Sequence, residues 1–104
     1  MSQFLVYRST GVSTRQVPYW LDIQSTLLSS LASRVIVPLF LPSAVKGKTS
    51  TTLTPTLRVE GKNVVMMTPE MASVLVHQLG PLVDDLESCR FEIVAALDFL
   101  ISGI

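Results

Sequence analysis

The segment that decides the fold is the end of the chain, residues 81–104, which reads PLVDDLESCRFEIVAALDFLISGI. Its apolar residues recur at gaps of three and four, the spacing that gathers side chains on one face of an α-helix. Pro81 suits a first helical position, and the acidic Asp84, Asp85 and Glu87 suit the positive end of a helix dipole. We therefore predict one long C-terminal helix that starts at Pro81. Its apolar face would hold Leu82, Leu86, Cys89, Ile93, Leu97, Leu100 and Ile104.

The last turns of this helix are apolar nearly all round, because Phe91, Val94, Phe99 and Ile101 add apolar groups on other faces. A helix of that kind has to be buried on more than one side. Packing against a second copy of the chain is the simplest solution, so we expect a homodimer. Gly103 can adopt a left-handed conformation and would end the helix.

The chain before this segment is predicted to form an antiparallel sheet, which makes the whole an α+β or barrel-like protein. Short stretches of β-branched and aromatic residues, separated by turn-forming residues, are typical of strands. Pro38 lacks an N–H, so we expect a bulge or the end of a strand pair there. Residues 41–52 are expected to form a loop with disorder. The predicted strands are 3–8, 18–24, 34–40, 56–60, 63–67 and 73–76, with a hairpin turn at Gly61-Lys62.

The predicted strand 18–24 alternates in character, which indicates that one of its faces is buried. Tyr19, Leu21 and Ile23 lie on one face. The other face carries Trp20, Asp22 and Gln24.

Length and composition limit the class of protein. A chain of 104 residues is expected to be one domain, 1–104. Its hydrophobic fraction of 48% excludes a disordered protein. The charged fraction is 15%, against about 25% in typical globular chains. The formal net charge of zero argues against a protein that grips nucleic acid directly. With no leader and no apolar stretch of about 20 residues, we expect a cytoplasmic protein without a membrane segment.

The balanced charge hides an asymmetry. Residues 81–104 hold one basic and five acidic side chains, a net charge of −4. Residues 1–80 hold seven basic and three acidic side chains, a net charge of +4. The acidic segment is either a solvated helix face or a surface that docks a basic partner, and both interpretations stay open.

Residues that support catalysis or metal binding are scarce. His77 is the only histidine, and Cys89, the only cysteine, is expected to be a small buried hydrophobe. The methionines Met66, Met67 and Met71 indicate core packing, with an adaptable binding surface as the alternative. We predict a protein that binds rather than catalyses, with no cofactor and no metal.

Four stretches together resemble the CcdB family of bacterial toxins over essentially the whole chain. They are Val6-Tyr7 with LDIQS (21–25), RVIVPL (34–39), MMTPEMASVLV (66–76) and the ending SGI (102–104). The resemblance implies an SH3-like, mostly antiparallel β fold with one long C-terminal helix, assembled as a homodimer.

The resemblance also implies a function in toxin–antitoxin systems of the plasmid-maintenance type. Such toxins bind the A subunit of DNA gyrase and trap it on cleaved DNA, so they are poisons and not enzymes. A CcdA-like antitoxin neutralises the toxin, and the two together repress their own operon. DNA would be reached only indirectly, through gyrase or the antitoxin.

The family's gyrase contacts map onto two places in this chain. One is the end of the helix, and the other is the segment after the Asp-x-Gln-Ser motif. The corresponding residues are Leu27, Leu28, Asp98, Ile101, Ser102, Gly103 and Ile104.

Three positions depart from the family pattern. Ser102 stands where the best-known members have a Trp, Asp98 replaces an Asn, and Leu75 replaces a Pro. The Trp can stack on an arginine of gyrase, a cation–π contact worth about 0.5–2 kcal/mol. Two alternatives therefore remain open: a MazF-like endoribonuclease of the same fold, and a relic that binds antitoxin without being toxic.

Overall fold

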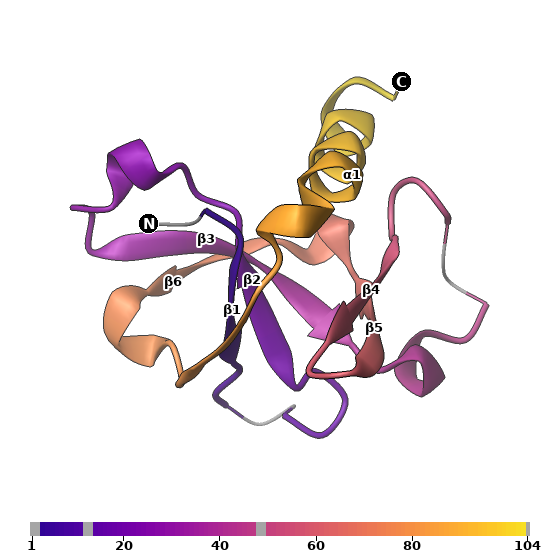
Figure 1. Ribbon diagram of the computed structural model, residues 1–104, viewed down its shortest axis with the longest axis horizontal. Coiled ribbons are helices and arrows are strands. Elements are labelled where there is room, and N and C mark those ends of the chain that lie inside the picture. Colours follow the sequence, from indigo (N-terminus) through magenta and orange to yellow (C-terminus); the bar gives the residue numbers. More distant parts are fainter. Residues whose placement is uncertain (1–2, 12–13, 48–49, 104) are drawn as a thin grey trace.

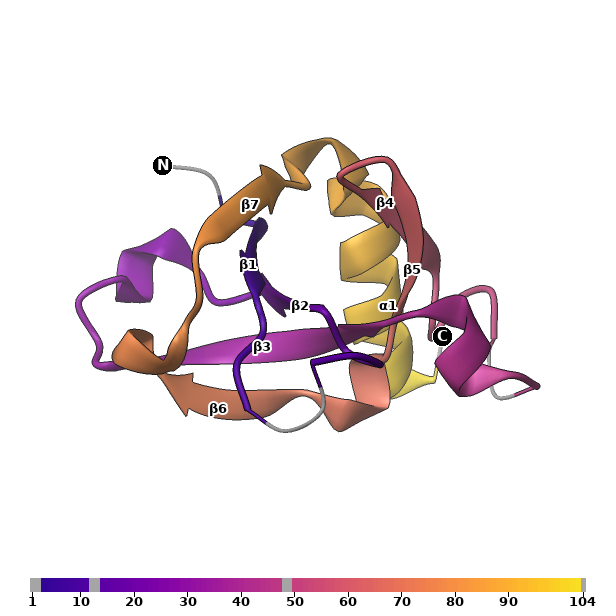
Figure 2. The ribbon, with the colours of Figure 1, turned by 90° about the horizontal axis from the view of Figure 1, so that it is seen from below.

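The computed structural model describes residues 3–11, 14–47 and 50–103. In this part of the chain, the strands form one antiparallel sheet with the order β4-β5-β3-β2-β1-β7, and β6 pairs with β3. The sheet curls round α1 as a half-barrel (Figures 1 and 2). The predicted class, a mainly antiparallel β protein with one C-terminal helix, is confirmed. The elements are β1 (Leu5–Arg8), β2 (Tyr19–Asp22), β3 (Ser33–Phe40), β4 (Thr56–Val59), β5 (Lys62–Met66), β6 (Ala72–Leu75), β7 (Leu82–Asp85) and α1 (Arg90–Ser102).

Strand β3 changes neighbours along one of its edges. It pairs with β6 from Ser33 to Ile36 and with β5 at Leu39 and Phe40. Pro38 lies in the gap between these two pairings, where its carbonyl accepts a hydrogen bond from the Met67 N–H at 3.1 Å. Because the N–H and C=O of a strand residue point the same way, the missing N–H of proline faces this gap and breaks no ladder. The end of a strand pair predicted at Pro38 is confirmed.

The core fills the space between the concave face of the sheet and α1. Ile93 and Ala96 of α1 are fully buried against strand residues that are also fully buried. Met66 and Met67 are buried too, which confirms the core-packing interpretation for both. The strand residues of this core with no exposed surface are Val6, Tyr19, Leu21, Val37, Leu39, Val59, Val64 and Met66.

The helix begins later than the sequence predicts. Leu82–Asp85 forms β7 and pairs with β1, and a short 3₁₀ turn, η5 (Glu87–Cys89), precedes α1. The edge of β1 offers unpaired backbone groups, and satisfying them stabilises a strand here more than a first helical turn would. Of the predicted apolar face, Leu82 thus lies in a strand and is 58% exposed. The helical part of the segment follows Leu86, first as η5 and then as α1.

The acidic residues before α1 do not complement a helix dipole, contrary to the prediction. Asp84 Oδ2 accepts a hydrogen bond from the Glu60 N–H at 3.0 Å, which ties β7 to the β4–β5 hairpin. Asp85 Oδ1 accepts from the Glu87 N–H at 2.8 Å and so caps η5. Both carboxylates serve the strand and its exit turn.

Four further predictions can be compared with the structure. The hairpin turn is Glu60-Gly61, one residue earlier than predicted, and both residues have positive φ, as a type I′ turn requires. Gly103 ends α1 in the left-handed region, as predicted. Cys89 is only partly buried, because η5 places it at the rim of the core. The loop 41–52 contains a 3₁₀ turn, Pro42–Val45, and its residues 48 and 49 lie outside the described residues.

Gly80 passes so close to β1 that we expect no side chain to fit. Its N–H donates to the Arg8 carbonyl at 3.1 Å, and a Cβ added there would lie 2.5 Å from that oxygen. Gly80→Ala should lower the free energy of unfolding by about 1–3 kcal/mol, because β7 must move off β1.

Urea denaturation would measure the effect of Gly80→Ala. The exposed Ser88→Ala is the control and should change stability by less than about 0.5 kcal/mol. If Gly80→Ala is as stable as this control, the close approach does not constrain β7.

Candidate functional site

The side of α1 that faces away from the sheet carries exposed apolar groups. Phe91 and Ile101 are each 83% exposed. Val94, Ala95 and Asp98 lie between them at gaps of three and four, so the five residues form one stripe along the helix. We call this stripe the outer face of α1. Large apolar groups exposed in one stripe mark a surface that another molecule covers.

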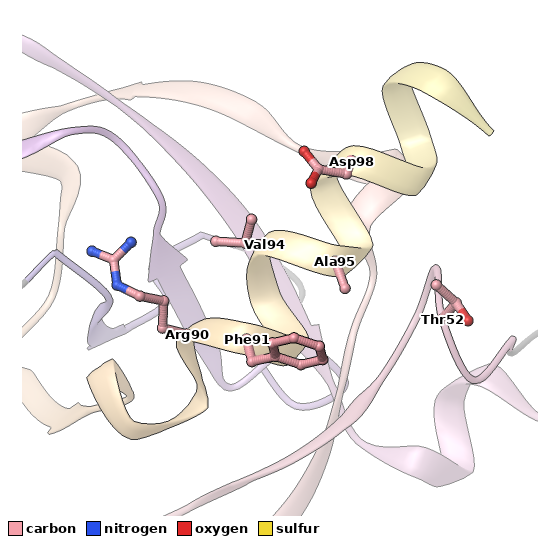
Figure 3. A pocket seen from close by; sticks show the side chains of 6 residues that line it. All are labelled: Thr52, Arg90, Phe91, Val94, Ala95 and Asp98. Carbon is pink, nitrogen blue, oxygen red and sulfur yellow. The ribbon is translucent and has the colours of Figure 1, made fainter. Parts of the chain in front are cut away.

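A shallow groove of about 690 Å³ runs along this outer face. Five residues of α1 line it, and Thr52 lines it from the loop opposite Phe91 and Ala95 (Figure 3). The α1 residues are Arg90, Phe91, Val94, Ala95 and Asp98. Sequence reasoning did not place Phe91 in the site. The sequence does place Phe91 off the predicted buried face of the helix. That position is equally consistent with a dimer contact, so it did not point to this groove.

The end of α1 is shaped by its cap. The Gly103 N–H donates to the Phe99 carbonyl at 2.9 Å, with φ +72° and ψ +18° at Gly103. The Ser102 hydroxyl donates to the Asp98 carbonyl at 2.7 Å, so it is satisfied inside the helix. Ile101, Ser102 and Gly103 are exposed together with Asp98, and Ile104 lies outside the described residues.

The second predicted patch lies on the 3₁₀ turn η1 (Thr26–Leu28). Leu27 is 90% exposed and Leu28 is 47% exposed. The Ser25 hydroxyl accepts from the Leu27 N–H at 3.2 Å, and the Gln24 amide donates to the Leu28 carbonyl at 3.1 Å. These hydrogen bonds fix the turn while leaving both leucines in solvent.

A buried ion pair holds the base of η1. Asp22 Oδ2 lies 2.8 Å from Arg34 Nη2, and Asp22 Oδ1 accepts from the Gln24 N–H at 3.0 Å. Asp22 and Gln24 are both buried, so the end of this second face beside η1 is covered, whereas Trp20 on the same face is only partly buried. Burial, and then the Asp22 charge, raise the pKa of Tyr7 beside this pair, with Arg34 opposing.

The two predicted patches are not adjacent within one chain. Both views place η1 and the end of α1 on opposite sides of the molecule (Figures 1 and 2). The structure therefore brings Asp98, Ile101, Ser102 and Gly103 together and leaves Leu27 and Leu28 apart from them.

Residues with catalytic potential do not converge. His77 is exposed on the 3₁₀ turn Val76–Gln78. In the part of the chain that the structure describes, no three His, Cys, Asp or Glu side chains are placed to hold a metal ion. None of the helices within residues 3–11, 14–47 and 50–103 is long and apolar enough to cross a membrane.

A curled antiparallel sheet with one apolar helix face turned to solvent defines a protein built to bind another macromolecule. Residues 3–103 match the family model described as CcdB protein. The chain therefore belongs to the CcdB family, the gyrase-poisoning toxins of CcdA/CcdB toxin–antitoxin systems, which are not enzymes. Membership implies two partners, the gyrase A subunit and CcdA, and confirms the family predicted from the sequence.

The Asp22–Arg34 pair should behave as one unit in unfolding. Arg34→Met leaves the Asp22 carboxylate buried without a counter-charge and should cost about 3–5 kcal/mol of stability. The double variant Asp22→Leu/Arg34→Met should cost less than the sum of the two single variants.

Urea denaturation of all three variants completes this double-mutant cycle. Glu87→Gln, which removes the exposed Glu87–Arg90 pair, is the control and should cost less than about 1 kcal/mol. Strictly additive losses would show that the two charges do not depend on each other.

Proposed function

We propose that this chain binds the gyrase A subunit through the end of α1. The supporting observation is the exposed cluster of Asp98, Ile101, Ser102 and Gly103, in which a large apolar side chain stands in solvent at a helix end. Ile104 belongs to the proposed contact by its position in the sequence. Leu27 and Leu28 form its second part.

The estimated binding energies support a gyrase contact that does not need the family's Trp at position 102. Full burial of an isoleucine side chain contributes about 1.5–3 kcal/mol, as much as the cation–π contact of about 0.5–2 kcal/mol that Ser102 cannot make. The Ser102 hydroxyl is already hydrogen-bonded to the Asp98 carbonyl, so burying it leaves no donor unpaired. Ile101 is therefore the proposed main anchor.

We further propose that the protein acts as a homodimer. Strand β6 pairs only with β3 in the described sheet, and it carries no charged residue to protect its outer edge. Leu75 in β6 and Val76 directly after it are exposed. Because the two proposed gyrase patches lie on opposite sides of one chain (Figures 1 and 2), one copy alone cannot turn both toward the same surface of gyrase.

The proposed antitoxin contact uses the acidic end of the chain. Glu92 and Asp98 are exposed on α1, within the segment of net charge −4. A basic, partly apolar segment of a CcdA-type antitoxin would cover both these charges and the outer face of α1. From membership of the family we extend the proposal to neutralisation by the antitoxin, co-repression of the operon through antitoxin-bound DNA, and action in the cytoplasm.

Changing the helix end should weaken poisoning strongly. Ile101→Asp replaces the proposed anchor with a charge, and removal of Gly103 and Ile104 deletes the tip. Each should raise the protein concentration needed to trap cleaved DNA by at least about tenfold, equivalent to 1.4 kcal/mol of binding. The measurement is a supercoiling and cleavage assay with purified gyrase and ATP.

The matched control for this assay is Leu82→Asp, which places the same charge at an exposed leucine on β7. It should poison gyrase as well as the unchanged protein does. If Leu82→Asp and Ile101→Asp are equally active, the end of α1 is not the contact. If the unchanged, folded protein traps no cleaved DNA, the relic alternative replaces the proposal.

The dimer proposal predicts that a charge on the β6 edge separates the copies. Leu75→Lys puts an ammonium group where a second copy would cover the strand, so sedimentation equilibrium should give a monomer for the variant and a dimer for the unchanged protein. Lys62→Glu, on the exposed start of β5, is the control and should remain dimeric. A monomeric unchanged protein at micromolar concentration would contradict the dimer.

A further inference from the structure

The convex face of the sheet carries a pocket that the gyrase contact does not use. Its volume is about 340 Å³. Trp20 and Pro38 lie on the face opposite Tyr19, Leu21 and Val37, which point toward α1. The pocket and the outer face of α1 are therefore on different layers of the molecule. The residues that line the pocket are Ser9, Thr10, Val17, Trp20, Pro38, Phe40 and Glu70.

The floor of the pocket is made of rings fixed by strand pairing. Trp20 lies directly opposite Pro38 across β2 and β3, and Phe40 is two residues further along the same face. Trp20, Pro38 and Phe40 are each only partly buried, so their surfaces remain accessible. An exposed indole face attracts cations, and the planar guanidinium of arginine stacks on it best.

The side-chain oxygens of the pocket can only accept hydrogen bonds from a ligand. The hydroxyls of Ser9 and Thr10 already donate, to the carbonyls of Val17 and Gln78, which leaves their lone pairs free. Glu70 adds a carboxylate at the end of the 3₁₀ turn η3 (Thr68–Glu70). Among the described residues that line the pocket, Glu70 is the charged one and none is a lysine or an arginine, so this lining is negative.

The Glu70 carboxylate differs from the other acidic groups of residues 1–80. Asp22 is paired with Arg34, and Glu60 accepts from Tyr19 at 2.8 Å and from Arg8 at 3.4 Å. Glu70 makes no side-chain hydrogen bond or ion pair with any residue that the structure describes. A lone carboxylate beside exposed rings is complementary to a cation that also has a flat surface.

We propose that this pocket binds one arginine side chain of an extended peptide segment from a partner protein. The guanidinium would stack on Trp20 and donate two hydrogen bonds to the Glu70 carboxylate. Phe40 and Pro38 would enclose the aliphatic part of the side chain. The site is independent of the helix end, so it lets the protein hold a basic segment and the gyrase surface separately.

Trp20 is the only tryptophan of the chain, so its fluorescence reports on this pocket alone. The test titrates the full chain with the peptide acetyl-Gly-Arg-Gly-amide and with the matched peptide in which neutral citrulline replaces arginine. The arginine peptide should give a saturable change with a Kd of about 1–10 mM, as suits a single side chain, and citrulline should give none. Glu70→Gln should weaken binding at least about threefold.

Two controls keep the result tied to the pocket. Glu87→Gln removes an exposed carboxylate in η5, outside both proposed contacts, and should bind the arginine peptide as the unchanged protein does. The thermal midpoint of Glu70→Gln should equal that of the unchanged protein, because the carboxylate supports no contact in the fold. Equal responses to arginine and citrulline, or binding unaffected by Glu70→Gln, would overturn the proposal.

Discussion

The change of partner along β3 is the constraint on which the rest of the structure depends. A strand that pairs with β6 at one end and with β5 at the other forces the sheet to bend between them. Pro38 stands at the bend, where its carbonyl accepts from the Met67 N–H and its missing N–H interrupts neither pairing. The curl makes the concave face that buries Ile93 and Ala96, and it thereby turns Phe91 and Ile101 outward. The exposed face of the helix is thus a consequence of sheet geometry.

The buried polar groups hold parts of the chain that strand pairing alone does not fix, namely the turn η1 and the β4–β5 hairpin turn. The Asp22–Arg34 pair joins β2 to β3, and Gln24 continues the connection into η1 with hydrogen bonds to Leu28, Ser33 and Val35. Each partner is satisfied, which is the condition for tolerating charge in an interior. On the other side, Tyr19 donates to Glu60 and anchors the hairpin turn, and burial, followed by the Glu60 acceptor, raises the pKa of this phenol.

Local sequence patterns predict most of the elements of this fold. They fail where a segment far away in the sequence determines which element forms. The strands, the break at Pro38 and the stop at Gly103 depend on residue type and spacing, so they could be predicted. Leu82–Asp85 fits a first helical turn as well as a strand, and only the open edge of β1 decides between them. Likewise, Leu27 and Leu28 could be predicted as a patch, but their distance from the helix end depends on the curl.

The order of the strands has a consequence for the synthesis of the protein. Strand β1 is made early, yet one of its two edges is completed only by β7, near the end of the chain. The helix that closes the core comes later still. Pairings between such distant segments form only once both have left the ribosome. A nascent chain therefore cannot complete the sheet, or present the proposed surface on α1, before β7 and α1 have left the ribosome.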